Sequence, residues 1–182
     1  MKKVFFILGV LLSLGMFCAC SSDDDNDNVI NGSSEGGFKE YKGEIISPIE
    51  KEDQYSEISD FLNTELRIDG PKGFFVDSNE YEDICITINS MKELQDLYSG
   101  DKDIPDIDFQ KYTLIIGKKS LSHSYHWIIK QELVLNNGQL ELYLYIPHLN
   151  SYYSAIQEMG FWGLYHKLQA KEISLNVIEV DD

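Results

Sequence analysis

The chain has 182 residues, of which 31 are acidic and 15 basic, so its formal net charge is −16. A chain this acidic repels phosphate backbones, which excludes nucleic acids as partners, and it is also repelled by anionic lipid headgroups. The length allows for one ordinary globular domain together with N-terminal segments.

Residues 1–19 have the three parts of a signal peptide. Lys2 and Lys3 form a positive start, residues 4–17 are almost entirely apolar, and small or thiol-bearing residues follow. The apolar run is too short for a spanning helix, which needs about 20 residues. We therefore expect this segment to direct export.

Cys20 is the expected site of lipid attachment. It follows Ala19 and precedes a polar stretch, and this arrangement resembles the lipobox of bacterial lipoproteins. The resemblance implies that the Cys20 thiol carries lipid and becomes the first residue, with several acyl chains giving stable anchoring. The alternative is a plain secretory signal with incidental cysteines. Cleavage would leave 13 basic against 31 acidic residues, a net charge of −18.

Residues 20–38 are expected to form a disordered acidic tether, since they have too few apolar residues to offset chain entropy. The stretch from Ser21 to Asp27 resembles the serine-plus-acidic signal that sends lipoproteins to the outer face of the outer membrane. A periplasmic, inward-facing lipoprotein is the alternative. We expect no membrane contact apart from the lipid.

Residues 39–182 are expected to form a single domain, and their strongest local signal is a hairpin. Asn137-Gly138 is the favoured pair for a two-residue type I′ turn. Pairing outward from this turn opposes Leu135 with Leu140 and Leu133 with Leu142, which gives one aliphatic face. The other face opposes, for example, Glu132 with Tyr143.

The remaining elements predict an α+β domain, a mostly antiparallel sheet with two or three helices packed against it. A helix over residues 55–66 has helical apolar spacing, Ser90 and Glu93 form a capping box for a second helix, and residues 151–159 suit a short third. Alternation and apolar runs predict further strands at 39–46, 73–76, 84–88, 112–116, 161–168 and 173–177.

No motif predicts a cofactor, a metal or catalysis. His123 and His126 are three apart, which places them on opposite faces of a strand and argues against a zinc site. Asp101, Asp103, Asp106 and Asp108 crowd one loop and form a weak calcium candidate. Cys85 lacks basic neighbours, which indicates a structural thiol. His148 and His166 are expected to be surface or half-buried residues. We therefore expect no enzyme activity.

The candidate binding feature is an aromatic concentration between residues 143 and 165. Tyrosine and tryptophan combine large contact area with a polar tip, which suits protein interfaces and, by stacking, sugars. The alternative is a second core beneath the helices, which uses the same residue types. The residues assigned to the patch are Tyr143, Tyr145, Trp162 and Tyr165.

Residues 84–180 resemble the C-terminal domain of the PrcB family in the order of their elements. The resemblance rests on Ile88-Asn89-Ser90 before a helix, then Ile107-Asp108-Phe109, then the apolar strand 112–117. These are small α+β domains of secreted bacterial proteins and lipoproteins, some of them linked with an exported protease complex. The resemblance implies an accessory role and brings no catalytic residues.

Together these observations predict a non-enzymatic, lipid-anchored accessory module that binds a protein partner, with a protease among the candidates. A glycan-binding accessory lipoprotein is the alternative. A hydrolase would require converging carboxylates or a histidine–carboxylate pair, which the sequence alone does not reveal.

Overall fold

The computed structural model describes residues 43–52, 54–67, 70–79, 81–122, 127–148, 156–169 and 172–181. All of them belong to one compact unit, Asn31–Asp182. No helix within the described residues is long and apolar enough to cross a membrane. The predicted signal peptide, Cys20 and the predicted tether lie outside the described residues.

One sheet contains four strands in the order β1-β6-β7-β9. The predicted hairpin forms its centre, and the predicted register over residues 130–145 is confirmed. Asn137 and Gly138 have φ angles of 50° and 81°, the left-handed values that a type I′ turn requires. Strand β9 runs parallel to β7, whereas the other neighbours are antiparallel. The strands are β1 (Glu44–Ile46), β6 (Lys130–Asn136), β7 (Gln139–Pro147) and β9 (Ile173–Val180).

The second sheet has the order β4-β5-β8, with all neighbours antiparallel. Its central strand β5 (Tyr112–Leu121) pairs over its whole length with β8 (Gln157–His166), and β4 (Ile84–Ile88) pairs on the other side. A separate small hairpin joins β2 (Leu66–Arg67) to β3 (Gly70–Pro71).

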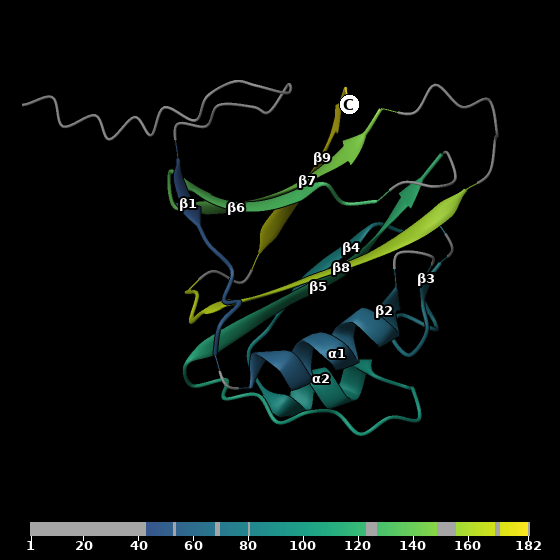
Figure 1. The fold of residues 1–182 in the computed structure, drawn as a ribbon, viewed down its shortest axis with the longest axis vertical. Coiled ribbons are helices and arrows are strands. Elements are labelled where there is room, and N and C mark those ends of the chain that lie inside the picture. Colours follow the sequence, from purple (N-terminus) through teal and green to yellow (C-terminus); the bar gives the residue numbers. More distant parts are fainter. Residues whose placement is uncertain are drawn as a thin grey trace, which may run out of the picture. The chain divides into compact units, whose positions relative to one another are not determined.

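Two helices lie on the far face of the three-stranded sheet, below it in Figure 1. Helix α1 (Tyr55–Glu65) buries Ile58, Phe61 and Leu62, as its apolar spacing predicts. Helix α2 (Met91–Leu97) begins at the predicted capping box. The Ser90 hydroxyl accepts from the Glu93 amide at 3.2 Å, and the Glu93 carboxylate accepts from the Asn89 amide at 2.6 Å.

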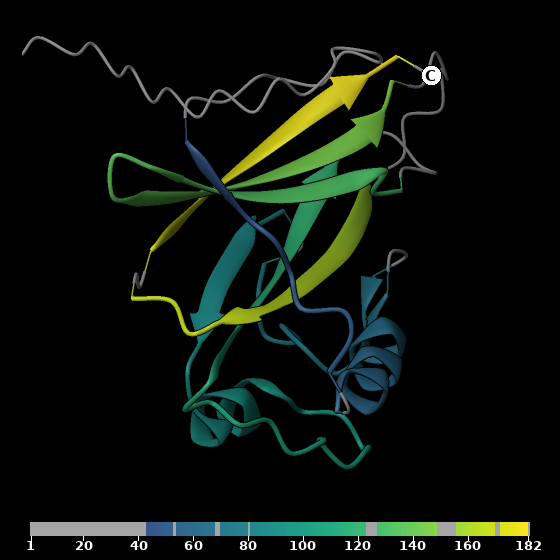
Figure 2. The ribbon, with the colours of Figure 1, turned by 60° about the vertical axis from the view of Figure 1, so that its left-hand side comes forward.

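Strand β5 separates the two main cores, because its alternate residues point to opposite faces. Leu114 and Ile116 pack with the helices, whereas Ile115 packs between the two sheets. The prediction that residues 112–116 form a central strand covered on both faces is confirmed. Burial of each such side chain stabilises the fold by about 1.5–3 kcal/mol. The three layers are visible in Figures 1 and 2.

The predicted α+β class is wrong, because strands dominate the described residues: nine strands in three sheets and two short helices. The predicted helix over residues 151–159 is the main error. Residues 157–159 belong to β8, where pairing with β5 outweighs local spacing, and residues 151–155 lie outside the described residues. Residues 73–76 are no strand either, since only Phe74 forms a bridge there, with Tyr98.

Candidate functional site

Two members of the predicted aromatic patch, Tyr143 and Tyr145, lie on the face of the four-stranded sheet that points away from the other sheet. Their exposed fractions are 4% and 0%, and they pack with Val134 and Val180. They are therefore buried side chains of a small third core, which differs from the alternative interpretation because it does not lie beneath the helices.

The other two members lie on opposite faces of β8. Tyr165 is buried between the sheets, and its hydroxyl accepts a hydrogen bond from the Gln131 side chain at 3.1 Å. Burial raises the pKa of Tyr165 to about 12, so the hydroxyl stays protonated. Trp162 is half-buried on the helix side, where its indole N–H donates to Asn63 Oδ1 at 2.9 Å. The four rings therefore do not form one patch.

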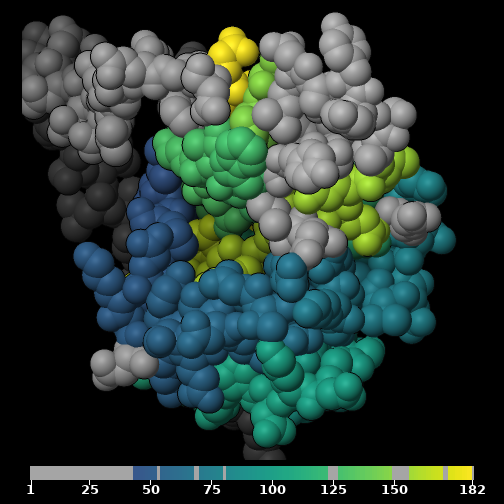
Figure 3. All heavy atoms as spheres, turned by 45° about the vertical axis from the view of Figure 1, so that its right-hand side comes forward, coloured from purple at the N-terminus to yellow at the C-terminus, as the bar shows by residue number. Residues whose placement is uncertain are grey.

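Trp162 instead lines a groove with Trp127, a residue that the sequence pattern did not single out. The groove has a volume of about 480 Å³ and lies where α1 and β2 meet β8 and the start of β6. We call it the tryptophan groove; its lining residues are Asn63, Leu66, Arg67, Trp127, Ile128, Gln131, Gly160, Phe161 and Trp162. Figure 3 shows this side of the molecule, with α1 and β2 in blue and β8 in yellow-green.

A second feature is the outer edge of β9, the last strand of the four-stranded sheet. The amide of His148, just after β7, donates to the Val180 carbonyl at 2.8 Å, so the backbone groups of Val180 face β7. Because backbone direction alternates along a strand, those of Leu175, Val177 and Glu179 face outward. Within the described residues no strand pairs with this side of β9. Figure 2 shows β9, in yellow, as the outermost strand of its sheet.

A groove of about 780 Å³ adjoins the start of β9 and separates it from β4, the edge strand of the other sheet. Its apolar lining comes from Ile86, Leu140 and Ile173, with Cys85 beside them. We call it the edge groove; its lining residues are Cys85, Ile86, Thr87, Gly138, Gln139, Leu140, Glu172, Ile173 and Ser174. An open strand edge with an adjacent side-chain cavity is the geometry that accepts an added strand.

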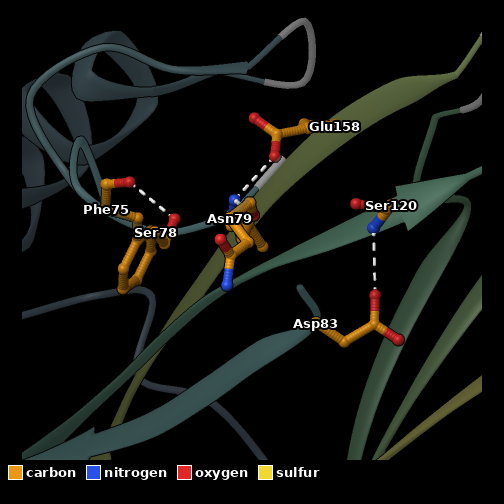
Figure 4. A network of polar contacts seen from close by, with 7 residues as sticks. Phe75, Ser78, Asn79, Asp83, Ser120 and Glu158 are labelled. Carbon is orange, nitrogen blue, oxygen red and sulfur yellow. Dashed lines mark hydrogen bonds and ion pairs between the residues drawn. The ribbon is translucent and has the colours of Figure 1, made fainter. Parts of the chain in front are cut away.

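Polar contacts fix the chain that leads into β4. Lys118 is 2% exposed, and its ammonium lies 2.6 Å from the Glu158 carboxylate and 2.9 Å from the Asn79 carbonyl. Asp83 accepts from the Ser120 amide at 3.1 Å and also pairs with a lysine of β5. Figure 4 shows that these contacts tie the loop before β4 to β5 and β8. One wall of the edge groove is therefore held before any ligand arrives.

The thiol in the edge groove has low nucleophilic reactivity. Cys85 is half-buried, and burial raises the pKa of its thiol to about 12. A thiol that stays protonated at neutral pH is a poor nucleophile, as expected for a structural cysteine. The edge groove therefore offers shape and backbone hydrogen bonding rather than nucleophilic chemistry.

Histidines and aspartates do not converge on a metal site within the described residues, where no three His, Cys, Asp or Glu side chains come together. Asp108 of the weak calcium candidate pairs with Lys111 at 3.2 Å, and this contact lowers the pKa of its carboxyl. His148 lies 2.7 Å from Glu179. His123 and His126 lie outside the described residues.

Another cavity brings His166 near carboxylates, the pairing that a hydrolase would need. The cavity is lined by residues 47–52 together with His166. Glu52, one of these lining residues, accepts a hydrogen bond from the Tyr112 hydroxyl at 2.5 Å. That hydrogen bond raises the pKa of Tyr112 to about 12, so the phenol acts as a donor that orients Glu52. The Tyr112 and His166 rings lie 6.1 Å apart. The Glu52 carboxylate therefore serves as a structural hydrogen-bond acceptor for Tyr112.

Comparison with known proteins finds no match for this chain: no family model, no curated protein and no solved structure resembles it.

Proposed function

We propose that this chain is a non-enzymatic accessory lipoprotein, anchored through Cys20, that binds an extended segment of a protein partner along β9. The observation that carries the proposal is the open edge of β9 with the edge groove at its start. Main-chain hydrogen bonds along such an edge supply affinity, and a cavity for alternate side chains supplies specificity.

The sequence of β9 supports binding because it lacks the devices that proteins use to block an edge. Strand Ile173–Val180 contains no proline, lysine or arginine, and its residues are mostly β-branched or aliphatic. Exposed edges of this kind pair with other chains unless charges, prolines or bulges prevent it. A long unblocked edge therefore favours a binding role over a purely structural one.

The charges around β9 indicate what kind of segment would pair with it. Glu172 and Asp181 flank the strand, Glu179 lies near its end, and all three are exposed, with no basic residue between positions 172 and 181. A second copy pairing antiparallel to β9 over its whole length would place Glu172 opposite Asp181 at both ends, which is unfavourable. We therefore expect a segment of another protein with apolar alternation and basic residues near its ends.

The resemblance to the PrcB family makes an exported protease the first partner to test. The lipid anchor would place both proteins on one membrane surface, which raises their effective concentration for each other. The outer face of the outer membrane is the proposed location, and the periplasmic face is the alternative.

The test is recovery of partners by full-length lipidated protein from detergent-solubilised membranes, with a matched pair of edge variants. Val177→Pro removes an outward N–H that an added strand needs, whereas Val177→Ala removes a similar part of the side chain and keeps the N–H. We expect wild type and Val177→Ala to recover one stoichiometric partner, and Val177→Pro to lose it by at least about tenfold. Glu179→Pro, at an exposed position, repeats the test with less change in the core.

Recovery of the same partner by both proline variants, or of no stoichiometric partner by the wild type, would overturn the proposal. The anchor is tested separately, because Cys20→Ser should release the protein from membranes without altering edge binding. Mass spectrometry of the mature N-terminus should show an acylated Cys20.

A further inference from the structure

The tryptophan groove contains both tryptophans of the chain, although they are 35 positions apart in sequence. Its volume of about 480 Å³ lies within the usual range for small-ligand sites, about 300–1,000 Å³. None of its nine lining residues is a carboxylate, in a chain with 31 acidic residues, and Arg67 is its cation. It shares no residue with the edge groove, so a ligand bound in it would be independent of the proposed function.

The Trp162 indole is fixed by contacts within the protein, and the Trp127 indole is exposed. The Trp162 N–H is fixed by Asn63, and the Tyr55 ring packs at 5.9 Å between centroids. Trp127 is 45% exposed, and no ring contact or hydrogen bond engages it in the described structure. Aromatic surface fixed before binding reduces the entropy that a ligand must overcome.

The polar group at the base of the groove also has a defined orientation. Gln131 Nε2 donates to the Trp162 carbonyl at 3.3 Å and to the Tyr165 hydroxyl at 3.1 Å. Because a carbonyl oxygen can only accept, the Gln131 amide nitrogen must face it. The Gln131 Oε1 atom has no donor within the described residues and is suited to accept from a ligand hydroxyl.

An extended peptide would meet an edge of β8 on which the Trp162 carbonyl already accepts from Gln131 at 3.3 Å. The carbonyl groups of Leu66 and Arg67 lie against Gly160, so close that a Cβ at that position would approach their atoms to 2.9 Å. Strand β2 therefore covers the face of β8 at the groove, since a Cβ points out of the plane of a sheet. What remains for recognition is indole surface and side-chain amides.

We propose that the tryptophan groove binds a neutral oligosaccharide, with a sugar ring against the Trp127 indole and hydroxyls on Gln131 and Asn63. Sugar rings combine an apolar face with peripheral hydroxyls, and an aromatic surface beside oriented amides complements both. The net charge of −16 repels anionic chains, and the groove has no carboxylate to attract cationic ones.

Because both tryptophans line the groove, intrinsic tryptophan fluorescence can report binding there. Titration of the full-length protein in detergent with cellohexaose, maltohexaose, xylohexaose, mannohexaose and chitohexaose should give a saturable change in intrinsic fluorescence with at least one of them. Calorimetry with that sugar should show binding about tenfold weaker for Trp127→Ala. Tyr81→Ala removes another exposed aromatic, outside the groove, and should bind as wild type does.

Absence of saturable binding with all five sugars would overturn the proposal. Equal binding by Trp127→Ala and wild type would overturn it as well. Saturation by hexagalacturonic acid alone would contradict the neutral assignment, and saturation by a proline-rich decapeptide alone would assign the groove to a peptide instead. Trp162→Phe keeps an aromatic ring but loses the hydrogen bond to Asn63. We therefore expect a smaller loss of sugar affinity for this variant than for Trp127→Ala.

Discussion

Strands β8 and β9 each stand last in their own sheet, yet the structure treats the two edges differently. Along β8, the Ile49 amide donates to the Leu164 carbonyl at 2.7 Å, and the Gln131 side chain donates to the Trp162 carbonyl. Along β9, the described residues provide no comparable partner on the outer side. One edge is covered from within the chain and the other is left open.

The described residues therefore protect the edge of one sheet and not that of the other. Covering β8 uses α1 and β2, which also line the tryptophan groove, and the segment before α1, whose Ile49 amide donates to β8. Covering β9 would need only a short strand or a few charged side chains, and within Ile173–Val180 the one charged side chain is Glu179. Among the described residues nothing blocks this edge, and this observation is the basis of the binding role proposed for it.

The largest expected effect concerns the covered edge, where β8 holds the buried ammonium of Lys118. Glu158→Gln would leave that charge without its carboxylate, 2.6 Å away in the wild type. We expect a loss of about 2–3 kcal/mol in the free energy of unfolding, below the usual cost for a fully buried pair because Glu158 keeps a quarter of its exposure.

Urea denaturation measures this loss, and Asp96→Asn is the matched control. The Asp96 carboxylate pairs with Lys92 on an exposed helix surface, where such pairs contribute less than about 0.5 kcal/mol. Equal losses for the two variants would mean that water screens the Lys118 pair and that this end of β8 is not truly covered.

A smaller effect is expected from Gly160→Ala, which probes the packing of β2 on the face of β8. An added Cβ would approach backbone atoms of Leu66 and Arg67, and these cannot move as a side-chain tip can. We expect a loss of about 2 kcal/mol, typical of overpacking. On the open edge, Glu179→Ala should change the free energy of unfolding by less than about 0.5 kcal/mol. If thermal denaturation ranks the two variants in the opposite order, the contrast between covered and open edges fails.

Local sequence signals predicted the elements that are held by local chemistry. The hairpin at Asn137-Gly138 and the helix capped by Ser90 were placed correctly because turn geometry and capping act within a few residues. The predicted helix over residues 151–159 is wrong for residues 157–159, since their strand structure depends on pairing with β5, about 40 positions earlier. Long-range pairing of this kind decided the fold class and has no local signature.

The candidate sites show the same contrast between local sequence signals and long-range contacts. Aromatic content selected Trp162, which lines a groove, but it also selected Tyr143, Tyr145 and Tyr165, which are buried. Trp127 was missed because its partner, Trp162, is distant in sequence. The open edge could have been suspected from the lack of proline and lysine in β9, but its place in the sheet depends on the topology.

The smallest expected effect uses the Cys85 thiol to ask how closed the edge groove is. Burial raises the pKa of this thiol from 9.0 to about 12, so the folded state keeps a proton that the unfolded state releases above pH 9. The stabilising contribution is therefore fully present below pH 9 and is lost as the pH rises toward 12. Between pH 9 and pH 10 the loss is at most about 1 kcal/mol.

Cys85→Ala removes this contribution and isolates it from other alkaline effects. The variant should lose less stability than wild type from pH 9 to pH 10, whereas both should lose stability above pH 10 through Tyr165, whose pKa burial raises to about 12. Urea denaturation at half-unit pH steps measures the difference. Parallel curves for the two proteins would show that water reaches the thiol freely, so that the apolar wall between β4 and β9 would be less closed than the packing around Cys85 indicates.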